Sequence, residues 1–345
     1  MTEPLHLVAG GSGYFGSLLV RKLRAAGLPV RVFDLVDADD RPADVEFVQG
    51  NILDAASIGR ACQGAAYVYH NVAELALSKD KAMLHAVNVV GTENLLQAAR
   101  AAKARKVVYT STSAVYGNPE RNPVTEAMTP VPQEAYGRAK RDGELACLRF
   151  AQEGGSVAIL RPCPILGHGR LGIFQLIFEW IRQGSNIPVL GSGNNRFQFV
   201  HADDLADACM LAARRAGSAV YNCGAERFGT MRETLEALCR FAGTGSRVRS
   251  IPFWPAVAAM KVTSALGLSP LGSYHALMYG RPMYFDIGLA RRELGWSPRY
   301  SNDEMLISSY SWYLEHREQV LNSPYASVHR SAVKQGVLAL IPRLL

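Results

Sequence analysis

Tyr136 and Lys140 are the residues whose types and spacing point most directly to chemistry. They are four residues apart in 134–152, a stretch with the apolar pattern of a helix, so both side chains project from one face. A tyrosine with an ordinary pKa of about 10 is a poor acid or base at neutral pH. A nearby ammonium group favours the phenolate and lowers that pKa. Tyr136 could then exchange a proton with a hydroxyl or a ketone while a hydride moves.

Hydroxyl side chains stand just upstream of this helix. Ser111 and Thr112 follow a predicted strand, Lys106–Thr110. Either hydroxyl could hydrogen-bond the oxygen of the reacting group, and the sequence does not choose between them. A lone tyrosine–lysine pair usually marks surface packing, so its meaning depends on these neighbours and on a binding site for a hydride carrier.

A glycine-rich turn predicts that binding site. The apolar strand Leu5–Ala9 runs into Gly10, Gly13 and Gly16, and a helical pattern follows. Glycine permits backbone angles and close approaches that a Cβ would forbid. Free N–H groups and the positive helix end then face a pyrophosphate.

The second predicted strand ends in Asp34, about 20 residues after the glycines, where a carboxylate binds the adenosine ribose hydroxyls. The same carboxylate would repel a 2′-phosphate, and no arginine follows it directly. We therefore predict NAD(H) rather than NADP(H) as the cofactor.

Strands alternate with helices up to about residue 160, which predicts an α/β fold with a Rossmann-type, doubly wound parallel sheet. The alternation then loosens, as expected of a smaller, mixed α/β C-terminal substrate lobe. We assign residues 1–165 to the cofactor domain, with 197–225 returning to it, and 166–322 mainly to the lobe. Residues 323–345 form a tail that mixes apolar and basic side chains.

Composition excludes several classes of protein. The 345 residues are 48% hydrophobic and 19% charged, which describes a globular protein, and the basic residues behind the net charge of +7 are dispersed, so we predict no nucleic-acid partner. The first strand begins near residue 5 and no long uncharged apolar run follows, so we predict neither a signal peptide nor a membrane-spanning helix. Six well-separated cysteines indicate reduced thiols in the cytoplasm. We predict no metal site, a filler role for Cys163 and a packed polar role for His201.

Further motifs lie at fixed places along the chain: Asn88-x-x-Gly91-Thr92, Val115-Tyr116-Gly117, Leu160-Arg161-Pro162, Val200-His201-x-x-Asp204 and Glu293-Leu294-Gly295-Trp296. Together with the glycine turn, Asp34 and the Tyr136–Lys140 pair, they resemble the extended short-chain dehydrogenase/reductase family, also called the NAD-dependent epimerase/dehydratase family. The resemblance runs from Leu5 to about Val320.

The resemblance implies roles for further residues. Lys140 would also bind the nicotinamide ribose, and Asn88 would help to organise the site. Asn51, which stands where the family usually has aspartate, and Ile52 would flank the adenine, and Val72 and Ala73 would line the pyrophosphate. The remaining cofactor contacts that the resemblance implies are Tyr14, Phe15 and Pro162.

The branches of the family differ in how they hold a substrate. Nucleotide-sugar epimerases and dehydratases use an asparagine and an arginine for the diphosphate, where this chain has Pro164 and Phe197, with Arg196 one residue away. Residues 251–284 are rich in apolar and aromatic side chains. This pattern resembles the 3β-hydroxysteroid dehydrogenase branch, and a bacterial 3-ketosphinganine reductase would fit it too. We therefore expect a ketone/secondary-alcohol oxidoreductase acting on a lipid. A nucleotide-sugar 4-epimerase or dehydratase is the alternative, and a non-catalytic subunit is a third.

The tail is too short to span a bilayer but mixed enough to lie on one. We expect it to contact an anionic membrane peripherally, on the inner face of the cytoplasmic membrane. Packing on the protein is the simpler alternative, and a homodimer is left open.

Overall fold

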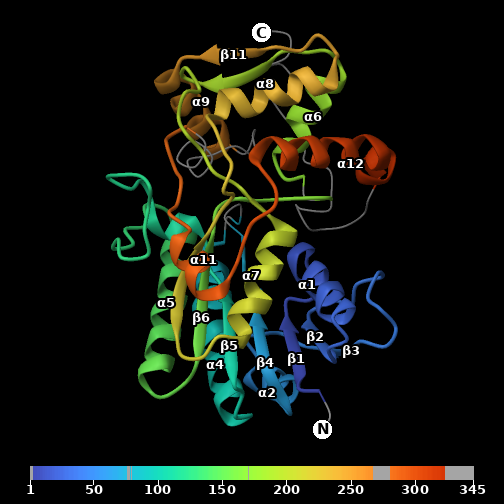
Figure 1. Cartoon of the computed structure of the whole chain (residues 1–345), viewed down its shortest axis with the longest axis vertical. Coiled ribbons are helices and arrows are strands. Elements are labelled where there is room, and N and C mark those ends of the chain that lie inside the picture. The colour runs from blue at the N-terminus through green and yellow to red at the C-terminus, as the bar shows by residue number, and fades with distance from the viewer. Residues whose placement is uncertain (1–2, 76–77, 79, 170, 267–279, 323–345) are drawn as a thin grey trace.

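A computed structural model describes residues 3–75, 78, 80–169, 171–266 and 280–322. The tail 323–345 and part of the apolar segment 251–284 lie outside these residues. A parallel sheet forms one end of the molecule (Figure 1). Its seven strands are β1 (Leu5–Ala9), β2 (Val30–Asp34), β3 (Glu46–Gln49), β4 (Ala65–His70), β5 (Lys106–Thr110), β6 (Val157–Pro162) and β10 (Ala219–Cys223).

The strand order is β10-β6-β5-β4-β1-β2-β3, and every neighbouring pair is parallel. The order reverses between β1 and β4, which is the point where open α/β sheets bind ligands beyond their carboxyl ends. The predicted Rossmann-type fold is confirmed, and β10 completes the sheet from within the segment expected to return to it.

Helices cover both faces of the sheet because successive strand residues point to opposite sides. Leu7 and Ala9 pack into one core with α2 (Ala55–Cys62), α4 (Gly91–Ala101) and α5 (Ala135–Gln152). Val8 packs into the other core, with α1 (Tyr14–Ala25), α7 (Ala202–Arg214) and α11 (Gly288–Leu294). Helix α11 contacts β10 and α7, so it packs with the cofactor domain, although it falls in the segment that we assigned mainly to the lobe.

The helical stretch over residues 81–101 is interrupted. It divides into α3 (Lys81–His85), a π-helical turn at Ala86–Val90 and α4. Such turns occur often at functional sites, and this one carries Asn88. Helix α2 was not predicted; its first turn is capped by Asp54, whose carboxylate accepts from the Ala56 N–H (3.0 Å).

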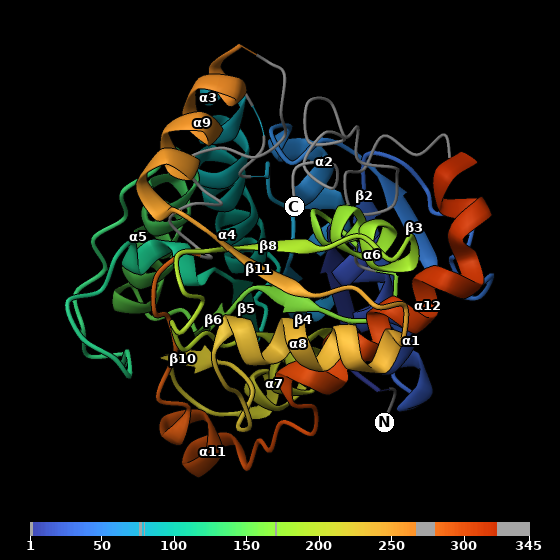
Figure 2. The same cartoon turned by 90° about the horizontal axis from the view of Figure 1, so that it is seen from above.

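The lobe lies at the end of the molecule away from the N-terminus (Figures 1 and 2). Its helices α6, α8 and α12 pack against one another, and Glu179 of α6 links this helix to α12 by accepting from Arg317, while it also accepts from Arg182 of its own helix. The elements are α6 (Phe174–Arg182), β8 (Ile187–Leu190), α8 (Met231–Ala242), β11 (Val248–Ile251), α9 (Phe253–Ala265) and α12 (Asn302–Asn322), with a small β7 (Ile165–Leu166) and β9 (Val200–His201) pair below.

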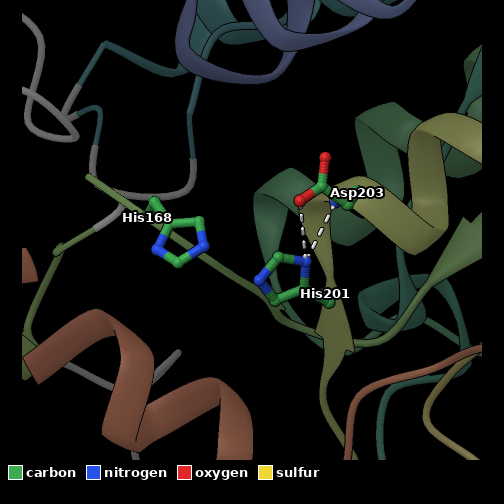
Figure 3. Close-up of side chains that lie close together, drawn as sticks. All are labelled: His168, His201 and Asp203. Atoms are coloured by element: carbon green, nitrogen blue, oxygen red, sulfur yellow. Dashed lines mark hydrogen bonds and ion pairs between the residues drawn. The ribbon is translucent and has the colours of Figure 1, made fainter. Parts of the chain in front are cut away.

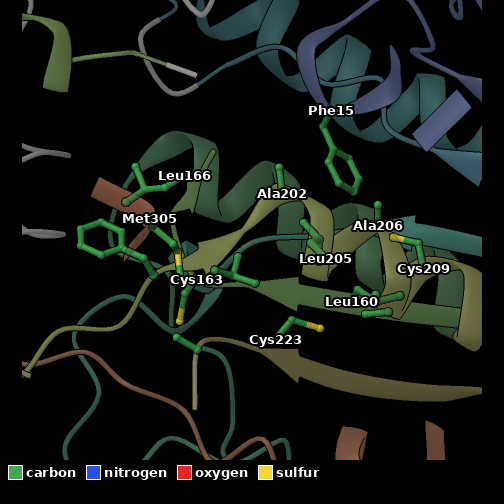
Figure 4. Packing of buried hydrophobic residues seen from close by; sticks show 14 of the residues in the cluster. Phe15, Leu160, Cys163, Leu166, Ala202, Leu205, Ala206, Cys209, Cys223 and Met305 are labelled. Atoms are coloured by element: carbon green, nitrogen blue, oxygen red, sulfur yellow. The ribbon is translucent and has the colours of Figure 1, made fainter. Parts of the chain in front are cut away.

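Cysteines serve as packing residues in this fold. Cys163, Cys209 and Cys223 lie among aliphatic side chains between the sheet and α7 (Figure 4), and all six cysteines are buried and free. Burial raises the pKa of the Cys163 thiol well above its ordinary value, so the prediction that Cys163 is a filler is consistent with its surroundings. Among the described helices, none has the length and apolar character needed to cross a bilayer.

Candidate active site

Many of the candidate residues gather at one edge of the sheet, because they lie at the carboxyl ends of six parallel strands. Gly10 follows β1, Asp34 ends β2, Asn51 follows β3, Val72 and Ala73 follow β4, Ser111 and Thr112 follow β5, and Pro162 ends β6. Residues spread over the first half of the chain thus line one rim.

The glycine turn is closed by backbone atoms. Gly10 has a positive φ of 81°, and a Cβ there would lie 2.8 Å from backbone atoms of Asn71 and Val72. A Cβ on Gly16 would overlap the carbonyl oxygen of Gly10. Gly13 is different, since its added Cβ would meet only the Gly10 oxygen, at 3.4 Å. Gly13 caps α1 without a side-chain hydrogen bond, and the first turn has no acidic residue, so this helix end suits a pyrophosphate.

The neighbouring residues of the turn divide into two kinds. Tyr14 is half-buried, and its hydroxyl lies beside Gly167. Phe15 points into the core (Figure 4) and is 8% exposed. Pro162 is buried at the end of β6. Tyr14 therefore has the most accessible side chain of these three predicted cofactor contacts.

The Asp34 carboxylate faces the glycine turn. It accepts from the Ser12 N–H (3.0 Å) and from the Leu35 N–H (2.8 Å). Partial burial raises the pKa of Asp34 and these backbone hydrogen bonds oppose the rise. The carboxylate thus lies between the glycine turn and the end of β2, where the predicted ribose contact requires it.

The turn that carries the predicted adenine contacts, Asn51 and Ile52, is held by hydrogen bonds and close packing. The Asn51 side-chain oxygen accepts from the Leu53 N–H (3.0 Å), which folds the turn before α2. Ile52 is buried, and a Cβ on Gly91 would lie 2.7 Å from it. Asn94 donates to the Ile52 carbonyl (3.0 Å). Gly91 of the Asn88 motif is therefore explained by close packing of α4 on this turn.

Asn88 fixes the segment that follows β4. Its amide donates to the Glu74 carbonyl (3.0 Å), and its side-chain oxygen accepts from the Glu74 N–H (3.2 Å). The residue is 1% exposed, so these two bonds are formed in a buried setting. Through Glu74, Asn88 positions the neighbouring Val72 and Ala73 along the rim.

Lys140 is fully buried under the same edge. Its ammonium donates to the Thr110 carbonyl at the end of β5 (2.7 Å) and lies over the Tyr109 ring, 4.2 Å from the centroid. Burial lowers the pKa of Lys140 to about 8, while the nearby Cys147 and Glu144 act in the opposite direction. A buried ammonium at this position provides a strong local positive field.

Tyr136 lies in the first turn of α5, half-buried against Leu84, Val89 and Ala139. The turn is held by Glu134, whose carboxylate accepts from the Tyr136 N–H (2.8 Å) and from the Gly137 N–H. Sequence reasoning missed this cap. The predicted helix began at Glu134, whereas the structure starts α5 at Ala135 and makes Glu134 its cap.

The two candidate hydroxyls have different surroundings. Ser111 donates its proton to the Glu144 carboxylate (2.6 Å). Thr112 instead accepts from the Ala114 N–H (3.2 Å), as the cap of a short 3₁₀ helix at Ser113–Tyr116. A hydroxyl that accepts one bond still has a proton to donate. Thr112 therefore keeps the donor that a reacting oxygen needs, whereas Ser111 uses its own internally.

A buried ionic network lies behind Ser111. Glu144, with no exposed surface, accepts from the Arg161 guanidinium at 2.8 and 2.7 Å, and Arg161 also donates to the Tyr116 hydroxyl (2.7 Å). Arg141 pairs with the same carboxylate at 3.0 Å. This network, which the sequence did not predict beyond Arg161 and Tyr116 as motif positions, ties β5, β6 and α5 together.

His168, His201 and Asp203 lie together near the start of α7 (Figure 3), with one potential ligand atom of each within 4.8 Å of the others. The His201 Nδ1 accepts from the Asp203 N–H (3.2 Å), so the ring caps α7. The Lys22 ammonium lies 3.6 Å from the Asp203 carboxylate, which opposes a second cation there. Capping of α7 and packing on Tyr300 (3.8 Å between rings) give His201 a structural role, and its interpretation as a packed polar residue stays a prediction.

Comparisons with known proteins define the class. The model of the NAD dependent epimerase/dehydratase family matches residues 6–224, so the chain belongs to this family of extended short-chain dehydrogenase/reductase enzymes. The family's dependence on NAD confirms the predicted NAD(H) cofactor at that level.

Particular relatives differ in activity. The chain is 50% identical to the uncharacterized protein y4nG of Sinorhizobium fredii, over 97% of this chain and 85% of that one. It is 28% identical to a 3 beta-hydroxysteroid dehydrogenase/Delta 5→4-isomerase of Mycobacterium tuberculosis, over 95% of each. A solved UDP-glucose 4-epimerase of Thermotoga maritima with UDP-glucose has the same fold, with a TM-score of 0.77 at 24% identity, over 91% of this chain and 99% of that one.

Proposed function

We propose that this enzyme interconverts a ketone and a secondary alcohol on a hydrophobic, lipid-like substrate, using NAD(H). When bound, the cofactor supplies or accepts the hydride. In the reducing direction the carbonyl carbon gains a hydride and its oxygen gains a proton, so that NADH, a proton and a ketone become NAD⁺ and a secondary alcohol.

The chain's own residues supply the proton and orient the oxygen. Tyr136 donates the proton to the developing alkoxide. The buried Lys140 ammonium stabilises the phenolate that remains. Thr112 donates a hydrogen bond to the reacting oxygen and holds it toward Tyr136. We assign this role to Thr112 because the Ser111 proton is already donated to Glu144, whereas the Thr112 hydroxyl accepts from the Ala114 N–H and so keeps its own proton.

The observation that carries the choice of substrate class is the burial of Phe197. It stands where the resemblance places the diphosphate-binding arginine, yet it has no exposed surface and packs on Phe199, 5.0 Å between ring centroids. The adjacent Arg196 guanidinium lies over the rings of Phe228 and Tyr284 (4.8 and 4.7 Å). An apolar substrate needs no cation at Phe197, whereas a nucleotide diphosphate does.

A nucleotide-sugar 4-epimerase or dehydratase is the second candidate. It is favoured by the likeness to the Thermotoga maritima epimerase structure and by the exposed position of Arg196. Such an enzyme would use Tyr136, Lys140 and Thr112 for the same proton and hydride steps while recycling bound NAD.

Incubation with NADH distinguishes the candidates. The purified protein is given either 3-keto lipids, with the ketosphingoid and 3-ketosteroid classes both represented, or UDP- and dTDP-sugars. We expect NADH consumption matched by alcohol formation with a keto lipid, and no net consumption with the sugars. Epimerised or dehydrated sugar, with no reduction of any keto lipid, would reject the lipid proposal in favour of the alternative.

A further inference from the structure

Helix α9 has an apolar face turned to solvent. Trp254, Val262 and Leu266 are 72%, 58% and 66% exposed, and with the exposed Ala258 they recur every four residues along one side of the helix. Among the α9 side chains that the structure describes, none is fully buried. Isolated exposed apolar residues are ordinary, but a stripe along a whole helix marks an interaction surface.

The segment that contains α9 carries charge of one sign. The sequence has no acidic residue between Glu236 and Asp286. The same stretch has five basic residues: Arg240, Arg247, Arg249, Lys261 and Arg281. Arg247, just before β11, Arg249 on β11 and Lys261 on α9 are exposed. Figure 2, seen from above, looks onto the end of the molecule where β11 and α9 lie.

We propose that α9 and its basic neighbours dock this enzyme on an anionic bilayer. The apolar stripe enters the headgroup boundary, Trp254 suits the interface by having an apolar ring and a polar N–H, and Lys261 reaches back to lipid phosphates. A segment whose charged residues are all basic is attracted to anionic lipid and would be a poor match for a basic or neutral protein partner.

Docking through α9 would also place a surface groove of the protein next to the lipid. A groove of about 470 Å³ lies between the start of α9, at Phe253 and Trp254, the loop 118–122 and residues 280–282. The loop is tied to the far wall, since Asn122 accepts from the Tyr284 N–H (3.0 Å). The loop begins six residues after Thr112 in the chain, and in the proposed docking the groove would be the route by which a lipid enters toward the candidate active site. This step rests on the proposed lipid substrate, whereas the docking itself does not.

Flotation with vesicles tests the docking. Full-length protein is mixed with vesicles of phosphatidylcholine, alone or with phosphatidylglycerol, at low and high salt. We expect salt-sensitive binding to the anionic vesicles only, reduced roughly tenfold or more by Trp254→Ser with Val262→Ser and Leu266→Ser. Leu145→Ser with Leu314→Ser, two exposed leucines on α5 and α12, is the matched control and should bind as wild type does.

Two further measurements separate the electrostatic attraction from the insertion of the apolar stripe. Replacing Arg247, Arg249 and Lys261 by glutamine should weaken binding by about fivefold per charge and flatten its salt dependence. Tryptophan emission should shift to the blue on anionic vesicles, and the shift should disappear in Trp254→Phe.

No flotation at low salt would overturn the docking. Binding that the triple serine variant keeps and deletion of residues 326–345 removes would overturn the assignment to α9 and place docking on the tail. Reduction of a water-soluble keto substrate is measured in parallel. Vesicle binding without ketone reduction would leave the docking standing and reject the proposed function, and the reverse result would do the opposite.

Discussion

The carboxyl edge of the sheet and the C-terminal lobe hold their residues by different means. At the edge, Gly10 and Gly16 have backbone atoms where a Cβ would lie, and Lys140 and Glu144 are buried with specific partners. In the lobe, α6, α8 and α12 pack mainly through apolar side chains, and α9 turns an apolar stripe to solvent. The edge therefore restricts which residues can stand there, and its chemistry can be inferred from the sequence. The lobe restricts only the size and polarity of what it contacts, so the substrate is harder to infer.

Among changes at the carboxyl edge, loss of the Tyr136 hydroxyl should have the largest effect on turnover. Tyr136→Phe removes the proposed proton donor and should lower turnover by about 10²–10⁴-fold. NADH binding should change little, because the ring and the fold around it remain. Turnover is measured with the keto substrate identified by the NADH assay, and NADH binding by fluorescence. Turnover within a few-fold of wild type would remove Tyr136 from the chemistry.

The buried network behind Ser111 should dominate the stability of the edge. Glu144→Ala leaves the Arg161 charge buried without its carboxylate, which should cost about 3–5 kcal/mol of unfolding free energy. The control is Glu153→Ala, which breaks an ion pair with Arg100 (2.7 Å) whose two side chains are 61% and 46% exposed and should cost less than about 1 kcal/mol. Urea unfolding compares them, and equal costs would contradict the view that this network holds the edge.

Acid should weaken the same half of the molecule through His70, which is buried at the end of β4 with its Nε2 on the Thr92 hydroxyl (2.9 Å). Burial lowers the pKa of His70 to about 3, against an ordinary value of 6.5. As the pH falls below 6.5 the unfolded chain binds this proton first, so stability is lost on acidification. At pH 5 the loss from this residue should be about 2 kcal/mol.

The measurement compares the free energies of unfolding at pH 7.5 and pH 5 for wild type and His70→Gln. The variant should lose less on acidification, whatever its stability at neutral pH. An unchanged difference between the two pH values would show that His70 is not held neutral in the fold.

The preference for NADH over NADPH tests the electrostatics of the rim, with a smaller expected effect than the changes above. Asp34→Ala removes the carboxylate that would repel a 2′-phosphate, and should narrow the preference for NADH over NADPH about tenfold. Asp44→Ala, an exposed carboxylate paired with Arg24, is the control and should leave the preference as it was. Kinetics with both cofactors decide it, and a wild-type preference for NADPH would mean that the role of Asp34 is misassigned.

The same contrast explains what the sequence could predict. Gly10, Asp34 and Thr112 follow short apolar strands, and the parallel order of those strands brings them to one rim, so local patterns were sufficient. Glu144 gave no such signal, because its partners Ser111 and Arg161 are 33 and 17 residues away in the chain. Helix α9 was missed because apolar residues occur on its inner side as well as along its exposed stripe, which removes the helical periodicity from the sequence. Strands β8 and β11 were missed because they lie beyond residue 160, where the alternation of strands and helices loosens. Phe197 was placed by its motif, but its full burial depends on contacts from Phe199 and residue 283.

Removal of two helix caps, one in each region, should have the smallest effects on unfolding free energy. The two variants should differ in their NADH affinity. In the lobe, Thr230 begins α8 with a capping box: its hydroxyl accepts from the Glu233 N–H (3.1 Å), and the Glu233 carboxylate accepts from the Thr230 N–H (2.7 Å). At the rim, Asp54 caps α2 beside Asn51. Thr230→Ala and Asp54→Ala should each cost about 1 kcal/mol of unfolding free energy.

Their effects on the cofactor should differ. Asp54→Ala loosens the turn that carries the predicted adenine contacts, so NADH affinity should fall together with stability. Thr230→Ala loosens a helix whose neighbours are α6, α12 and β11, so stability should fall and NADH affinity should not. Urea unfolding and NADH titration are measured on both variants. If Thr230→Ala weakened NADH binding as much as Asp54→Ala does, the lobe would be coupled to the rim, and the separation of cofactor binding from the substrate-facing lobe would be wrong.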